Sequence, residues 1–285
     1  MTTIVVEKRA PRVRIPPQYL APLLITVILL AAQTLGQTRG MLLSYGQLLT
    51  AIGAAIVTEV VLARLWYGRW PSLASAYITG ISVGILVRSF AWWPYALTSM
   101  IAIASKYVLR VKGRHLWNPS NFGISLILFL AERLHGNIAS LSHQWDNRWY
   151  VVLVIWLLGG FIVGRLKRLH ITLTYVASFL AFAVLRSAIT HAPVLSEIAP
   201  ITGPMYQLYI FFMITDPKTT VQSRRGQILV AFLVALAEMI LRLFQQVHAP
   251  YYALFLVGPA ANLIDIWNSE RKKTLKPQMN TDAHR

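Results

Sequence analysis

The sequence contains no cysteine, and this absence excludes several kinds of chemistry. A disulfide framework, a thiolate-ligated zinc or iron–sulfur site and a cysteine nucleophile are all ruled out. The seven histidines are scattered, and no two of them are four residues apart. Histidines on different helices remain an alternative as haem ligands, but their positions near expected membrane boundaries favour an interfacial role. We predict no metal site and identify no catalytic residue.

Charged residues are also scarce. They make up only 13% of the 285 residues, whereas 56% are hydrophobic. A soluble domain of this length needs more polar surface than that. The apolar residues come in runs of about 17–23, close to the length that crosses a bilayer as a helix. The sequence therefore predicts an all-α polytopic membrane protein in contact with the lipid bilayer.

The charges that are present are mostly basic, with 27 Lys and Arg against 10 Asp and Glu. In a soluble protein such an excess suggests nucleic-acid binding, but the chain has no zinc finger and no basic helix interleaved with aromatic residues. Lys and Arg accumulate in the cytoplasmic loops of membrane proteins. We therefore predict no nucleic-acid partner.

The basic residues also predict the topology. If ten apolar segments cross the membrane from a cytoplasmic N-terminus, every inner loop carries at least two basic residues and no outer loop more than two. A cleaved signal peptide is the alternative for the first segment, but it would leave nine spans and invert this pattern. The segments are 20–36, 42–63, 72–87, 92–109, 118–134, 149–164, 169–189, 201–214, 227–247 and 249–267.

These segments define the expected domains. A cytoplasmic tail at 1–19 precedes one transmembrane domain at 20–267, and a polar, disordered cytoplasmic tail follows at 268–285. The domain divides into halves at 20–134 and 149–267. Interrupted segments at matching places in two halves are typical of inverted repeats with a site at their interface. The third and eighth segments match in this way, as do the fifth and tenth, so two inverted five-helix halves are expected.

Glycine and proline mark where helices are expected to break. The third segment contains Gly80 and Gly84, the eighth begins near Gly203-Pro204, and the tenth contains Gly258-Pro259. The fifth opens at Asn118-Pro119, where proline favours a helix start. A helix rarely runs straight through an internal proline. We therefore expect broken helices that surround a polar site.

Charged side chains inside a membrane are costly, which makes each one a functional candidate. Glu238 lies inside the ninth segment with Arg242 four residues later, so either a role in ion flow or a neutralising ion pair is expected. Glu59 lies near the inner end of the second segment, close to Arg64, where a snorkelling carboxylate is the favoured interpretation.

Four motifs carry a resemblance to a known family: "SAYITGISVGIL", "HLWNPSNFG", "FFMITDPKT" and "GPAANLIDIW", in that order. The chain resembles the membrane flavoproteins of two redox pumps, the RnfD-type subunit of the Rnf ferredoxin:NAD oxidoreductase and the NqrB-type subunit of the sodium-translocating NADH:quinone reductase. Shorter relatives associated with enediyne biosynthetic clusters share the Asn-Pro-Ser-Asn-Phe sequence. The resemblance implies ten helices in two inverted halves, a bacterial inner membrane, other subunits as partners, and electron transfer through flavin.

In that family, FMN is joined to the threonine of a Ser-Gly-Ala-Thr motif upstream of Thr-Asp-Pro. Counted back from Asp216, the matching position here is Tyr206, and Thr202 lies four residues too early. Covalent FMN is therefore not expected. An aromatic-rich, broken-helix cavity suits a flavin, FMN or riboflavin, held non-covalently. The absence of a dinucleotide fingerprint indicates that the chain does not bind NADH itself.

Three functions follow from these features. The first is a membrane electron-transport subunit that acts with partners. The second is a small-solute channel or transporter of urea-channel-like architecture, and the third is a non-catalytic component of an enediyne-type biosynthetic assembly. Whether the chain is itself an enzyme stays open, because no complete catalytic motif is present. The residues expected to line or brace a cofactor site are Thr215, Asp216, Asn118, Asn121, Asn262 and Tyr206.

Overall fold

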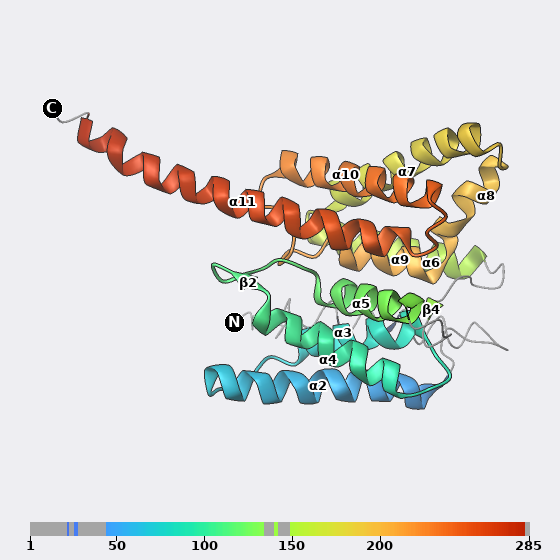
Figure 1. Ribbon diagram of the computed structural model, residues 1–285, viewed down its shortest axis with the longest axis horizontal. Coiled ribbons are helices and arrows are strands. Elements are labelled where there is room, and N and C mark those ends of the chain that lie inside the picture. The colour runs from blue at the N-terminus through green and yellow to red at the C-terminus, as the bar shows by residue number, and fades with distance from the viewer. Residues whose placement is uncertain (1–21, 23–25, 28–43, 134–139, 142–148, 283–285) are drawn as a thin grey trace, which may run out of the picture.

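The computed structural model describes residues 22, 26–27, 44–133, 140–141 and 149–282. The tail at 1–19 lies outside the described residues, as does almost all of the first expected segment at 20–36 and its signal-peptide alternative. The described chain is built almost entirely from helices that run roughly along one direction (Figure 1). An all-α membrane architecture is thereby confirmed.

The first group of helices contains α2 (Tyr45–Tyr67), α3 (Ala74–Leu86), α4 (Trp93–Val108) and α5 (Pro119–Arg133). A tight hairpin of β2 (Arg110–Val111) and β3 (Arg114–His115) connects α4 to α5, and β1 (Val87–Arg88) pairs antiparallel with β4 (Ser140–Leu141). Helix α2 packs along α3 and α4, and α4 packs along α5.

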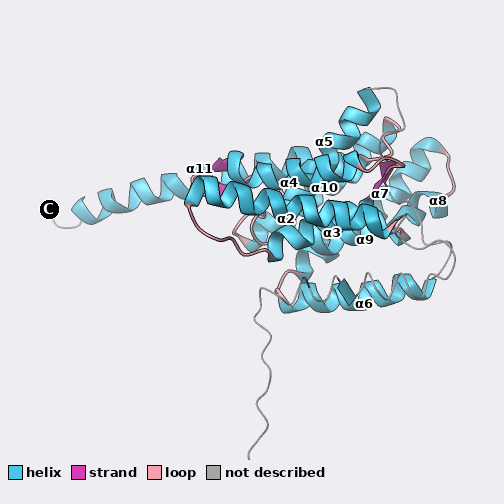
Figure 2. Ribbon diagram, turned by 90° about the horizontal axis from the view of Figure 1, so that it is seen from below, coloured by secondary structure: helices cyan, strands magenta, loops and turns pink. Residues whose placement is uncertain are grey.

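The second group begins with α6 (Trp149–Arg165), which lies at one side of the bundle (Figure 2), and α7 (Leu169–Thr190). Four short elements follow: α8 (Val194–Ile198), the 3₁₀ turn η1 (Ala199–Thr202), α9 (Pro204–Leu208) and the π-helical η2 (Tyr209–Met213). The group ends with α10 (Arg224–Leu243) and α11 (Ala249–Asp282). Helix α10 packs along α7 and α11, and α11 packs on α5.

The expected apolar segments from 42–63 onward each coincide with one helix, except 201–214, which forms the series of short elements. Among the described residues, α2, α7 and α10 are long and apolar enough to cross a membrane, and two shorter apolar helices lie at Ala74–Leu86 and Val152–Arg165. Proline at the start of α5 and the interrupted eighth segment are also confirmed.

Two expected breaks are wrong. Helix α3 continues through its glycines, because these serve close packing: a Cβ added at Gly80 would lie 2.5 Å from the Cα of Ile52 on α2. Helix α11 continues through Pro259. Proline removes the donor to the carbonyl four residues earlier, and here the indole Nε1 of Trp117 donates to that Phe255 carbonyl at 2.9 Å. A side chain thus replaces the missing backbone hydrogen bond.

The expectation of a disordered tail after Asn268 is also wrong, since α11 extends to Asp282 and projects from the bundle (Figure 1). Side-chain contacts support its first projecting turn. The Ser269 hydroxyl donates to the Asp265 carbonyl at 2.7 Å, and Glu270 pairs with Lys112 of the β2–β3 hairpin at 2.9 Å. The pair with Lys112 ties this turn of α11 to the β2–β3 hairpin.

Candidate functional site

The loop between η2 and α10, residues 215–223, is held by hydrogen bonds to both helix groups. The Asp216 carboxylate accepts from Asn118 Nδ2 at the start of α5 at 3.1 Å. It also accepts from the Thr219 hydroxyl at 3.0 Å and the Lys218 backbone N–H at 3.1 Å. Burial raises the pKa of Asp216, and these donors oppose the shift. Asp216 therefore acts as the cap that shapes the loop and ties it to α5.

Two residues of α11 hold the same loop from its other side. Asn262 Nδ2 donates to the carbonyls of Thr219 at 2.6 Å and Leu116 at 3.0 Å. The Asp265 carboxylate pairs with Arg114 Nη1 at 2.8 Å and accepts from the Gln222 backbone N–H at 3.3 Å. The loop, β3 and the middle of α11 thus form one polar junction, which brings Asp216 and Asp265 to the same end of the bundle.

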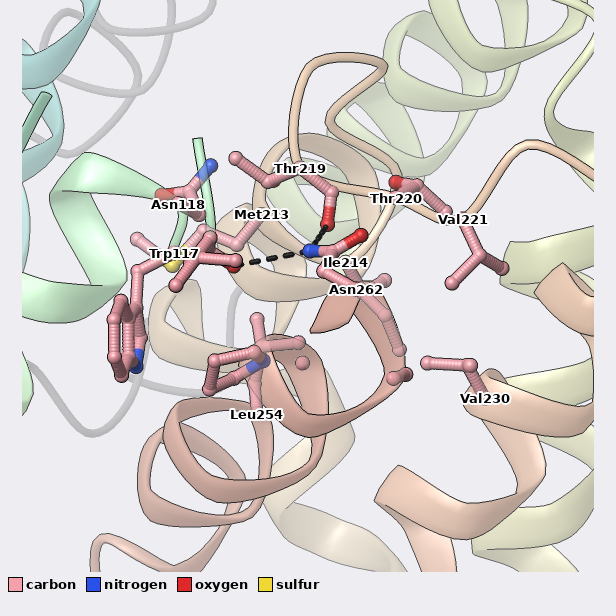
Figure 3. A pocket seen from close by; sticks show the side chains of 14 residues that line it. Trp117, Asn118, Met213, Ile214, Thr219, Thr220, Val221, Val230, Leu254 and Asn262 are labelled. Carbon is pink, nitrogen blue, oxygen red and sulfur yellow. Dashed lines mark hydrogen bonds between the residues drawn. The ribbon is translucent and has the colours of Figure 1, made fainter. Parts of the chain in front are cut away.

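A small cavity lies at this junction. It has a volume of about 20 Å³, and Figure 3 shows Asn262 inside it, between the loop and the segment that precedes α5. Its polar lining comes from Asn118, Thr219, Thr220 and Asn262, and apolar side chains such as Leu254 and Met213 complete the wall. A cavity of this volume can hold about one water molecule.

The structure brings together five of the six residues expected at a cofactor site. Asn118 and Asn262 line the cavity, and Asp216 is hydrogen-bonded to Asn118. Asn121 lies one turn further along α5 and donates to the Tyr251 carbonyl at 3.1 Å. The Thr215 hydroxyl donates to the Phe211 carbonyl at 2.6 Å, so it is used within its own helical turn. Neither residue lines the cavity: Asn121 ties α5 to α11, and Thr215 stabilises the end of η2.

The sixth residue, Tyr206, belongs to a separate buried network. Its hydroxyl donates to Glu238 and accepts from Arg242 Nη2. The expected pair is present, with Arg242 Nε 3.0 Å from Glu238 Oε1, and Tyr175 of α7 donates to the other carboxylate oxygen at 2.5 Å. Glu238 is 0% exposed and receives donors from α7, α9 and α10. Its charge is balanced within the protein.

Glu59 does not snorkel to the membrane surface as expected. It pairs with Lys106 of α4 and accepts from the Tyr107 hydroxyl at 3.0 Å, and both members of the pair are buried. Arg64 instead lies over the Trp70 ring, 4.1 Å from its centroid. Glu59 is therefore a buried ion-pair partner between α2 and α4, and the snorkelling interpretation is wrong.

Sequence reasoning missed Lys106, Tyr175 and Trp117, each of which satisfies a polar group on another helix. The buried role of Lys106 could have been predicted, because it is a basic residue inside an apolar segment and a carboxylate is available on a neighbouring helix. The roles of Tyr175 and Trp117 could not, since aromatic residues are common throughout membrane helices.

Comparison with known proteins identifies the family. The model of the NQR2, RnfD, RnfE family matches residues 132–274, half of the chain. The chain belongs to this family. The match contains the Thr-Asp-Pro loop and most of α11, whereas "SAYITGISVGIL" and "HLWNPSNFG" precede it.

Two relatives are named as D-type subunits of an ion-translocating oxidoreductase complex. The protein from Erwinia tasmaniensis is 27% identical over 139 residues, 48% of this chain and 38% of the relative. The protein from Shewanella piezotolerans is 28% identical over 161 residues, 52% of this chain and 43% of the relative. The aligned part of this chain therefore spans about two-fifths of each relative's length.

The cavity at the polar junction does not fit the flavin that the family resemblance implies. A cavity of about 20 Å³ cannot hold an isoalloxazine ring. At the position of the family's flavin-bearing threonine, Tyr206 is fully buried and its hydroxyl is bonded to Glu238 and Arg242. The nearby Thr202 hydroxyl donates to the Ala199 carbonyl at 2.7 Å. The Tyr206 hydroxyl is therefore not presented to a flavin phosphate.

Proposed function

We propose that this protein is a membrane subunit of an ion-translocating oxidoreductase complex. The observation that carries the proposal is the family match across residues 132–274, which contains the polar junction around Asp216. Both relatives bear the name of a subunit of such a complex. The described part of the chain offers no grouping of three His, Asp or Glu side chains suited to a metal. Partner subunits are expected to supply the dinucleotide site and the metal redox centres.

We further propose that the chain forms ten spans in two inverted halves, with both termini in the cytoplasm of a bacterial inner membrane. The packing order supports this arrangement. In the first half α2 packs on α4 and α4 on α5, and in the second half α7 packs on α10 and α10 on α11. The two series occupy equivalent places in halves of five segments each.

The absence of cysteine allows a clean test of this topology. Two exposed residues are each replaced by a single cysteine: Lys218 in the 215–223 loop and Leu195 in α8. A membrane-impermeant maleimide added to intact cells is expected to label Leu195→Cys and to spare Lys218→Cys, with the reverse result in inside-out vesicles. Labelling of both sites from the same side would refute the proposed arrangement.

Flavin content is the second test. We propose that the chain carries no covalent FMN, whereas non-covalent flavin stays a prediction. Protein purified in mild detergent from its own host is denatured, and the chain is examined for flavin fluorescence after electrophoresis. Fluorescence retained on the denatured chain would contradict the proposal. Flavin released into the supernatant in near-equal amounts to the protein would support non-covalent binding.

The complex itself is tested by deletion and complementation. Inside-out vesicles from the host are supplied with an electron donor, and ion uptake is measured with and without the chain. Uptake is expected to fall on deletion and to return with the tagged chain, which should co-purify with redox subunits. If the isolated chain instead lets a small solute swell proteoliposomes and no redox subunit accompanies it, the channel alternative replaces this proposal.

A further inference from the structure

The cavity at the polar junction contains a buried oxygen with no hydrogen-bond donor. Asn262 is 1% exposed, and its Oδ1 has no partner. The orientation of this amide is fixed by its surroundings, because both hydrogens of Nδ2 are used by the carbonyls of Leu116 and Thr219. A flipped amide would place an oxygen against two carbonyl oxygens. The unpartnered atom is therefore an acceptor.

Most of the other polar atoms around the cavity are acceptors as well; the donor among the lining side chains, Asn118 Nδ2, gives one hydrogen to Asp216. The Leu116 and Thr219 carbonyls each keep a lone pair after accepting from Asn262. The hydroxyls of Thr219 and Thr220 donate to the side chain and the backbone of Asp216, so their oxygens are left with lone pairs only. The Asp216 carboxylate lies one hydrogen bond away and adds negative potential. Such a lining favours an electropositive ligand and disfavours an anion.

Size restricts the ligand further. A volume of about 20 Å³ exceeds the minimum of about 10–15 Å³ that one water molecule requires, and it leaves no room for a larger solute. A buried acceptor without a donor is destabilising, so a ligand that donates to it, or coordinates it, stabilises the fold.

We propose that this cavity is a binding site for one electropositive ligand of water size, held on Asn262 Oδ1. The ligand is either a water molecule or a monovalent cation, since both satisfy a cluster of lone pairs. It connects α11, the 215–223 loop and the segment before α5, and so completes the contact between the two helix groups. The proposal does not depend on the proposed redox function.

A structure of the intact protein in lipid nanodiscs or crystals, with thallium(I) in place of potassium, tests the site directly. A density peak within hydrogen-bonding distance of Asn262 Oδ1 is expected. An anomalous thallium signal at that peak assigns a monovalent cation, and a peak without the signal assigns water. A cavity without density would overturn the proposal.

Discussion

The buried network around Glu238 allows a quantitative prediction. In Glu238→Gln the carboxylate charge is lost while the shape is kept, so Arg242 becomes a buried cation without a counter-charge. Breaking a buried ion pair by changing one partner costs about 3–5 kcal/mol. A single amide oxygen also cannot accept from Arg242, Tyr175 and Tyr206 together. We expect a loss of about 3–4 kcal/mol, after allowing for the hydrogen bonds that Gln retains.

For a chain of this size, such a loss lowers the melting temperature by about 6–16 °C, at about 2–4 °C per kcal/mol. Thermal unfolding in one detergent, followed by size-exclusion chromatography, measures the shift. The double variant Glu238→Gln/Arg242→Gln is expected to lose clearly less than the sum of the two single variants, since the uncompensated charge is gone.

The exposed pair between Lys112 and Glu270 is the control, and Glu270→Gln is expected to cost about 0–1 kcal/mol. If Glu238→Gln shifts the melting temperature no more than this control, or if the two charge removals simply add, the network does not act as a coupled unit. Such a result would contradict the inference that Glu238 is held within the protein and is not a mobile carrier of ions.

Three further predictions concern the junction and the helix packing. Asp216→Ala removes the acceptor of Asn118 and should raise the rate of tryptic cleavage in the 215–223 loop several-fold, measured by mass spectrometry. Burial and nearby cations lower the pKa of His115 to about 4. The stabilising contribution of its neutral form is therefore complete above a pH of about 6.5 and is lost as the pH falls towards 4. His115→Gln should flatten that part of the profile of melting temperature against pH. Gly80→Ala should cost about 1–3 kcal/mol because it forces α3 away from α2, whereas Gly53→Ala should not destabilise the fold.

The positions of the helices were readable from the sequence because each depends on a local property. Apolar runs predicted the helices in general. A proline at a helix start predicted α5, and a Gly-Pro pair near a segment end predicted the interrupted eighth segment. The continuity of α11 was not readable in this way, since it depends on Trp117, which is distant in sequence and replaces the bond that Pro259 cannot make. A break at proline is decided by whether another element reaches the freed carbonyl, and local sequence does not contain that information.

Partners across helices were the part of the candidate site that the sequence did not determine. The i,i+4 pair of Glu238 and Arg242 was predicted because both residues lie on one helix. The partner of Glu59 was not, because Lys106 reaches it from α4 and the choice between Lys106 and Arg64 depends on how α2 and α4 pack. Tyr206 was placed by its distance from Asp216, but only the fold showed that its hydroxyl joins the Glu238 network.

The two buried clusters together explain how an irregular segment stays in place inside an apolar bundle. The short elements η1, α9 and η2 cannot satisfy their backbone as one long helix does. Their middle is tied to α7 and α10 through Tyr206 of α9 and Glu238, and the loop that follows them is tied to α5 through Asp216 and Asn118. Each tie uses a carboxylate that accepts several donors, which is the strongest kind of hydrogen bond available to a short segment. The interrupted span is therefore a fixed element between the two helix groups, and any motion linked to ion transfer would have to break one of these carboxylate contacts.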